Sequence, residues 1–155
     1  TPQSPMTVAA FEAMGAKPTP MAFSEVFTSL QQGVINGQEN PLAMIRSGSL
    51  YEVQKYVNET EHLRGWVYIA MGEKKYQSLP DDLKEVVNEA AKEAQNYEHE
   101  LFLEDEKNLR KELEDKGMEF IEVDQTLFSD KAVPGVEAIL TEKQRVLYDK
   151  IKAAN

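Results

Sequence analysis

The chain has 155 residues and no cysteine, so it is long enough for one ordinary domain but has no disulfide framework, thiol nucleophile or thiolate metal site. Its net charge of −10 argues against a nucleic-acid partner and against an anionic membrane surface, because both would be repelled. The charge does not exclude an anionic small ligand, since one local arginine or helix N-terminus can outweigh the global field.

The N-terminal third is predicted to consist of short helices joined by tight turns. Ser4 and Pro5 are typical of the cap and the first position of a helix, and Gly15 is a plausible residue to end it. Ser24 is expected to cap a second helix that Gly33 ends. Short helices alone do not decide the fold class, which depends on the strands and helices predicted further along the chain.

Two short segments in the middle of the chain have the composition of strands. One is Tyr56–Val57, and the other is Trp66–Met71, which is apolar at nearly every position. A strand that is apolar on both faces is typical of the middle of a covered sheet. A third strand is expected at Met118–Val123, followed by an amphipathic helix at Val136–Ile151.

The segment from Asp81 to Lys116 contains no Gly or Pro and is predicted to be one long helix, which Gly117 ends. At 1.5 Å per residue it would be roughly 50 Å long, more than the width of a small domain. Its apolar stripe thins toward the C-terminal end and does not keep a strict heptad, so a coiled coil is the weaker alternative. We expect the helix to span two packing units.

The loop Gly37–Pro41 gathers an unusual number of polar side chains before a proline-led helix. Asn40 either caps that helix or offers its amide to a ligand. Phe23 has a similar ambiguity: it either packs across the helix start against Phe27 or Leu30, or forms an aromatic wall beside a ligand. The residues alone leave both alternatives open.

No catalytic or metal-binding motif is visible. The two histidines, His62 and His99, have no carboxylate at metal-ligand spacing, and no nucleophile elbow or phosphate-binding glycine loop is present. His99 is expected to be solvent-exposed on the long helix, whereas His62 precedes a turn and is either a ligand contact or a satisfied loop residue. The chain is therefore predicted not to be an enzyme and to need no cofactor or metal.

Three stretches carry a family resemblance and occur in order along the chain. They read PTPMAFSEVFTSLQQGVINGQENPLAMI, LYEVQKYVNETEH and KKYQSLPDDLKEVVNEAAKEAQ. Together they resemble the C-terminal half of DctP-type solute receptors of TRAP (tripartite ATP-independent periplasmic) transporters. The resemblance implies an α/β fold: the second lobe plus crossover elements of a two-lobed periplasmic-binding-protein-like fold, with a mixed sheet, helices on both faces and one very long helix.

The resemblance also implies a division of the chain into segments. Residues 1–65 would belong to the ligand-binding lobe, 66–80 would form a strand and turn of the other lobe, 81–117 the long helix spanning both lobes, and 118–155 a strand and C-terminal helices. The N-terminal lobe of the family would be lacking. The family's carboxylate-clamping arginine would stand immediately before Thr1, and neither Arg46 nor Arg64 matches its position, so we expect weak acid binding by this chain.

Seven positions match ligand-binding positions of the family or lie close to them. They are Gln3, Phe23, Gln38, Glu39, Asn40, His62 and Trp66. The resemblance favours ligand contact over the alternative roles of Phe23 and Asn40.

The function that the resemblance implies is that of a periplasmic receptor. It would bind a small organic acid such as a dicarboxylate and deliver it to TRAP membrane permease subunits, without chemical conversion. Because strands such as Trp66–Met71 would lack partners, we expect a dimer or an exchange of elements between copies. The alternative function is an acidic helical protein-interaction domain with no small-molecule ligand.

Overall fold

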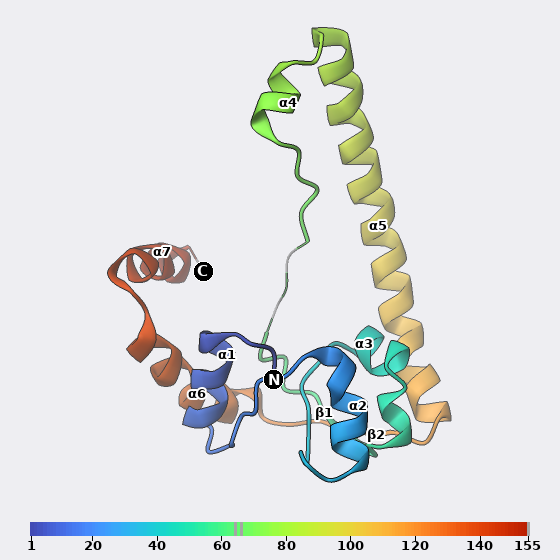
Figure 1. Ribbon diagram of the computed structural model, residues 1–155, viewed down its shortest axis with the longest axis vertical. Helices are drawn as coiled ribbons and strands as arrows, with labels where there is room; N and C mark the ends of the chain where they lie inside the picture. Colours follow the sequence, from blue (N-terminus) through green and yellow to red (C-terminus); the bar gives the residue numbers. More distant parts are fainter. Residues whose placement is uncertain (64, 66, 155) are drawn as a thin grey trace.

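The structure is a computed structural model that describes residues 1–63, 65 and 67–154. Its elements are, in chain order, α1 (Pro5–Ala13), α2 (Phe23–Gln31), α3 (Leu42–Ser47), η1 (Leu50–Glu52), β1 (Tyr56–Asn58), α4 (Glu73–Gln77), α5 (Asp81–Asp115), β2 (Glu119–Ile121), α6 (Gln125–Ile139) and α7 (Glu142–Ala153). Helices α1, α6 and α7 lie on one side of the base of the molecule, and α2, α3 and both strands lie on the other (Figure 1). Helix α5 rises away from this base.

The sheet of the described residues has two parallel strands in place of the expected mixed sheet. Tyr56 pairs with Glu119, Val57 with Phe120 and Asn58 with Ile121. The strand predicted at 66–71 is wrong for Val67–Met71, which have no regular secondary structure, and Trp66 lies outside the described residues. Val67 is 96% exposed. An apolar pattern alone does not make a strand, because the backbone needs a neighbouring strand to pair with.

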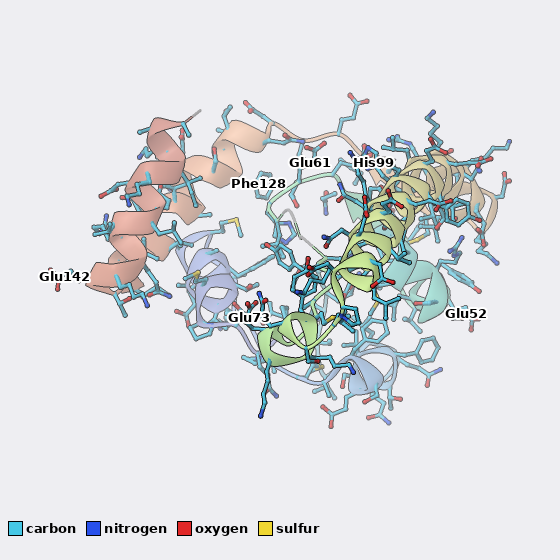
Figure 2. The ribbon with its side chains drawn as sticks, turned by 90° about the horizontal axis from the view of Figure 1, so that it is seen from above. Glu52, Glu61, Glu73, His99, Phe128 and Glu142 are labelled. Atoms are coloured by element: carbon cyan, nitrogen blue, oxygen red, sulfur yellow. The ribbon has the colours of Figure 1, made fainter. Side chains whose placement is uncertain are left out.

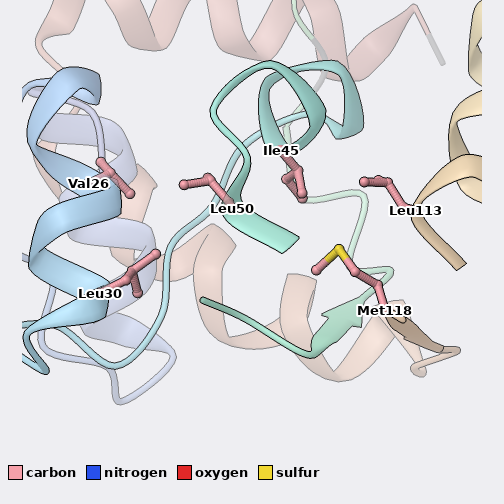
Figure 3. Close-up of a cluster of buried hydrophobic side chains, with 6 residues drawn as sticks. All are labelled: Val26, Leu30, Ile45, Leu50, Leu113 and Met118. Atoms are coloured by element: carbon pink, nitrogen blue, oxygen red, sulfur yellow. The ribbon is translucent and has the colours of Figure 1, made fainter. Parts of the chain in front are cut away.

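The hydrophobic core lies between α2, α3, η1 and the C-terminal end of α5 (Figure 3). Six buried side chains form it: Val26, Leu30, Ile45, Leu50, Leu113 and Met118. The short β1–β2 ladder runs below this cluster, with Val57 and Phe120 packed against it. The core therefore fixes α3 and β1, the two elements that flank the polar loop and the segment around His62.

Helices α1 and α6 pack closely because Gly135 has no side chain. A Cβ atom at Gly135 would lie 2.5 Å from Cβ of Ala13 and 2.8 Å from the carbonyl oxygen of Ala9. The helix predicted at Val136–Ile151 is instead two helices, α6 and α7, separated at Leu140. The side chain of Thr141 caps α7, and this cap ends the continuity that the apolar pattern suggested.

Helix α5 confirms the predicted long helix almost residue for residue. Its C-terminal end is packed, since Leu109 is 1% and Leu113 0% exposed. Figure 2 looks down this helix and shows side chains projecting from it, with the exposed His99 among them. In the part of the chain that the structure describes, no helix has both the length and the apolar character that a membrane crossing requires.

Candidate ligand-binding site

The polar loop before α3 is held by its own side chains. Nδ2 of Asn40 donates to Oε1 of Gln38 at 2.6 Å. Asn40 does not cap α3: the residue at the cap position is Pro41, and no side chain makes a capping hydrogen bond there. The capping alternative for Asn40 is therefore wrong, and the loop carries more polar groups than the helix start uses.

His62 joins this loop to the segment that follows β1. Its Nε2 lies 3.2 Å from Oε2 of Glu39, and its Nδ1 lies 2.7 Å from Oγ1 of Thr60. The ring of Phe11 on α1 and the imidazole form a T-shaped pair, with 5.2 Å between centroids and an interplanar angle of 85°. The side chains of His62 and Glu39 are 24% and 11% exposed, so Glu39 is the more enclosed partner of a contact that solvent still reaches.

The segment carrying Thr60 and His62 is fixed by Glu59. The backbone N–H of Glu59 donates to the carbonyl of Ile121 at 3.0 Å, which extends the ladder beyond β1. Nη1 of Arg110 on α5 lies 2.6 Å from Oε1 of Glu59, and Nε2 of Gln125 donates to the Glu59 carbonyl at 3.2 Å. A hydrogen bond to Glu114 and, to a lesser extent, one to Glu59 raise the pKa of Arg110, so this guanidinium stays charged.

A second arginine joins α3, the helix that follows the polar loop, to α5. Nη1 and Nη2 of Arg46, at the end of α3, lie 3.1 and 3.2 Å from the two carboxylate oxygens of Asp105 on α5. Glu112 adds a longer contact at 3.4 Å. This fork-to-fork geometry specifies orientation as well as attraction. Helix α5 thus holds both α3 and the exit of β1.

Phe23 is the first residue of α2, and its ring covers Gly48 just beyond α3. A Cβ atom at Gly48 would lie 2.8 Å from Cζ of Phe23. The residue at the cap position is Ala22, not Ser24, and its N–H donates to Glu25 at 3.2 Å. Phe23 therefore does not occupy the position before the cap that a hydrophobic staple needs, and the residue is 38% exposed.

The structure brings four of the seven expected site residues into two hydrogen-bonded pairs, Gln38 with Asn40 and Glu39 with His62. Phe23 lies at the far end of α3, a helix of six residues and about 9 Å. Gln3 is exposed in the segment before α1, and Trp66 lies outside the described residues.

Sequence reasoning missed three neighbours of the site: Phe11, Gly48 and Thr60. Only Thr60 could have been found from the sequence, because it stands two residues before His62. Phe11 and Gly48 are neighbours through the fold and had no local signal.

The chemistry of this site is that of hydrogen bonding to a polar small molecule. It offers two amides, a carboxylate and an imidazole, with Phe11 beside the imidazole. Within the described ranges no group of three or more His, Asp or Glu side chains is placed to hold a metal ion. A solute-binding protein is the class that this fold and site define.

Comparison with known families agrees with that class. The family described as bacterial extracellular solute-binding protein, family 7 (DctP), matches residues 1–140. The chain therefore belongs to this family. Membership in this two-lobed family, which the sequence predicted, is confirmed, and so is the very long helix.

Characterised relatives support the same assignment. A solute-binding protein of Roseobacter denitrificans is 49% identical over 97% of this chain and 46% of its own length. The 2,3-diketo-L-gulonate-binding periplasmic protein of Escherichia coli is 34% identical over 84% of this chain and 40% of its own length. The chain thus spans about half the length of the relatives it matches, and those relatives are solute-binding proteins rather than enzymes.

Solved structures show the same fold. A TRAP periplasmic solute binding protein from Roseobacter denitrificans with bound L-galactonate has a TM-score of 0.83 and 49% identity, covering 97% of this chain and 50% of that one. Another, from Ochrobacterium anthropi with bound L-fuconate, has a TM-score of 0.82 and 36% identity, covering 99% and 50%.

Proposed function

We propose that this chain belongs to an extracytoplasmic receptor that binds a hydroxylated organic acid and delivers it, without chemical conversion, to the membrane permease of a TRAP-type transporter. The observation that carries the proposal is the meeting of Gln38, Glu39, Asn40 and His62 beside α3 in a chain of this family. The periplasmic character of the family and of its relatives supports an extracytoplasmic location.

The chemistry of the site favours an acid that also carries hydroxyl groups. Glu39 would repel a second carboxylate, but its oxygens accept hydrogen bonds from hydroxyl groups. The amides of Gln38 and Asn40 supply N–H donors that suit a ligand carboxylate. L-galactonate and L-fuconate, which two similar structures contain, combine one carboxylate with several hydroxyl groups. The proposed ligand class is therefore a sugar acid.

For the organisation of the chain, we propose the segments 1–65, 66–80, 81–117 and 118–155 described above. The difference between the two ends of α5 supports this division. Leu109 and Leu113 are buried against the base, whereas Leu83 and Val86 near the N-terminal end are 46% and 57% exposed. A helix that is packed at one end and exposed at the other fits an element shared between two lobes.

The test is titration calorimetry of the folded chain with L-galactonate, L-fuconate and succinate at millimolar concentrations. We expect the two sugar acids to bind and succinate to bind less tightly, because succinate lacks hydroxyl groups.

Asn40→Ala should weaken sugar-acid binding by roughly fivefold, the equivalent of one hydrogen bond of about 1 kcal/mol. Asn36→Ala, an exposed amide earlier in the same connection, is the matched control. No binding of any sugar acid to the folded chain, or equal binding by the two variants, would contradict the proposal.

A further inference from the structure

The two ring nitrogens of His62 have partners of different chemistry. Nε2 faces Oε2 of Glu39 at 3.2 Å, and Nδ1 faces Oγ1 of Thr60 at 2.7 Å. An ionised carboxylate only accepts hydrogen bonds, whereas a hydroxyl group can donate or accept. In neutral His62 the ring proton therefore belongs on Nε2, where it points at Glu39, and the Thr60 hydroxyl donates to Nδ1.

The backbone between the two residues is bent into an unusual conformation. Glu61 has a φ of 43°, in the left-handed region that residues with a Cβ atom rarely adopt. This turn brings the imidazole of His62 back over the hydroxyl of Thr60. Such a conformation persists where its surroundings hold it, and it concentrates at functional positions.

Thr60 itself stands on a rigid part of the molecule. The preceding residue, Glu59, is bonded through its backbone to Ile121 and Gln125 and through its side chain to Arg110. The N–H of Thr60 donates to the carbonyl of Asn58 at 2.9 Å. The hydroxyl of Thr60 is thus a fixed point from which a chain of hydrogen bonds leads through His62 to Glu39 and the polar loop.

We propose that Thr60 is a positioning residue for the ligand-binding loop. Its hydroxyl holds the neutral imidazole of His62 in the orientation and tautomer that donate Nε2–H to Glu39, and Glu39 in turn fixes the loop that carries Gln38 and Asn40. The effect on ligand binding rests on the proposed function. The hydrogen bonding of His62 does not depend on it.

Two substitutions separate the hydroxyl group from the shape of the side chain. Thr60→Val keeps the branched shape and removes the hydroxyl, and Thr60→Ser keeps the hydroxyl. The first readout is the nitrogen and N–H proton resonances of the His62 imidazole in alkaline buffer, where free imidazole is neutral. The chain has two histidines, so His62→Gln and His99→Gln assign the signals.

The expected spectrum of the unsubstituted chain has the proton on Nε2, where the hydrogen bond to Glu39 slows its exchange with water, and a hydrogen-bonded Nδ1. Thr60→Val should shift the Nδ1 resonance to that of an unbonded nitrogen and speed Nε2–H exchange several-fold, and Thr60→Ser should restore both. A ring proton found on Nδ1, or a spectrum that Thr60→Val leaves unchanged, overturns the proposal.

The second readout is affinity for L-galactonate, with far-UV circular dichroism as the control for folding. We expect Thr60→Val to bind several-fold more weakly and Thr60→Ser to bind as the unsubstituted chain does. Equal affinity of all three overturns the role in ligand binding. If the unsubstituted folded chain binds no sugar acid, the proposed function fails, whereas the imidazole spectrum still decides whether Thr60 orients His62.

Discussion

Gly48 lies under the ring of Phe23, and no larger residue fits there without a shift. A Cβ atom would lie 2.8 Å from Cζ of the ring and 3.1 Å from the carbonyl oxygen of Met44. The ring can rotate away, but the backbone carbonyl cannot do so alone. This glycine therefore lets the tip of the aromatic ring approach the C-terminal end of α3 closely.

We expect Gly48→Ala to destabilise the chain by about 1 kcal/mol, at the low end of the range for overpacking. Gly37→Ala is the control, because a Cβ atom there would meet nothing within 4 Å. That change should be neutral or stabilising by up to about 1 kcal/mol, since alanine restricts the unfolded chain. Urea unfolding of both variants gives the comparison. Equal stability of the two variants would mean that the ring does not need the space.

At the scale of single elements, the N-terminal cap of α6 carries a titrating group. Asp124 accepts hydrogen bonds from the side chain of Thr126 at 2.6 Å and from its backbone N–H at 3.0 Å. These two bonds hold the pKa of Asp124 below its ordinary value, and the bond from the Thr126 side chain has the larger effect. The stabilisation is therefore present in full above the ordinary carboxyl pKa of about 3.9 and is lost as the pH falls through the lowered value.

Asp124→Ala should lower the free energy of unfolding at neutral pH, and the difference from the unsubstituted chain should shrink toward about pH 3. Thr141 caps α7 with a hydroxyl group that does not titrate. The penalty of Thr141→Ala should therefore stay constant over the same range. Urea unfolding at several pH values measures both. A penalty of Asp124→Ala that does not vary with pH would show that the ionised carboxylate is not the stabilising species.

Several helix ends were predictable because a local signal marks them. Ser4 accepts from the N–H of Thr7 at 3.4 Å, and Gly15, Gly33 and Gly117 all have the positive φ that ends a helix. The continuation of α6 through Pro134 was not predictable. Proline favours a break, yet the helix runs from Gln125 to Ile139. Next to the proline, Gly135 lets α1 approach closely, a contact between distant segments that no local pattern contains.

The site was predictable to a similar degree and for the same reason. The family resemblance indicated Glu39 and His62 separately, but their contact joins residues 23 positions apart and depends on where the core places α3 and β1. The residues Asn40 and Phe23 looked like capping and staple residues because local rules favour those roles. The structure gives the cap positions to Pro41 and Ala22 instead.

At the scale of the whole molecule, the chain exposes far more surface than a compact protein of its size. Its accessible surface is 11,840 Å² for a mass of 17.5 kDa, whereas a compact monomer of that mass exposes about 7,900 Å². Large apolar residues are exposed along the N-terminal part of α5 and at Val67–Met71. Surface of this kind drives association.

We therefore expect the isolated chain to self-associate at micromolar concentrations through the apolar stripe of α5. The net charge of −10 opposes this association, so it should strengthen as salt screens the repulsion. Tyr97 and Leu101, 65% and 48% exposed, are four residues apart and share one face of the helix, whereas Leu103, 47% exposed, points away from it. Leu101→Gln should shift the sedimentation coefficient toward that of a monomer, and Leu103→Gln should not. A monomer at both low and high salt, unaffected by either substitution, would show that the exposed stripe does not hold two copies of this chain together.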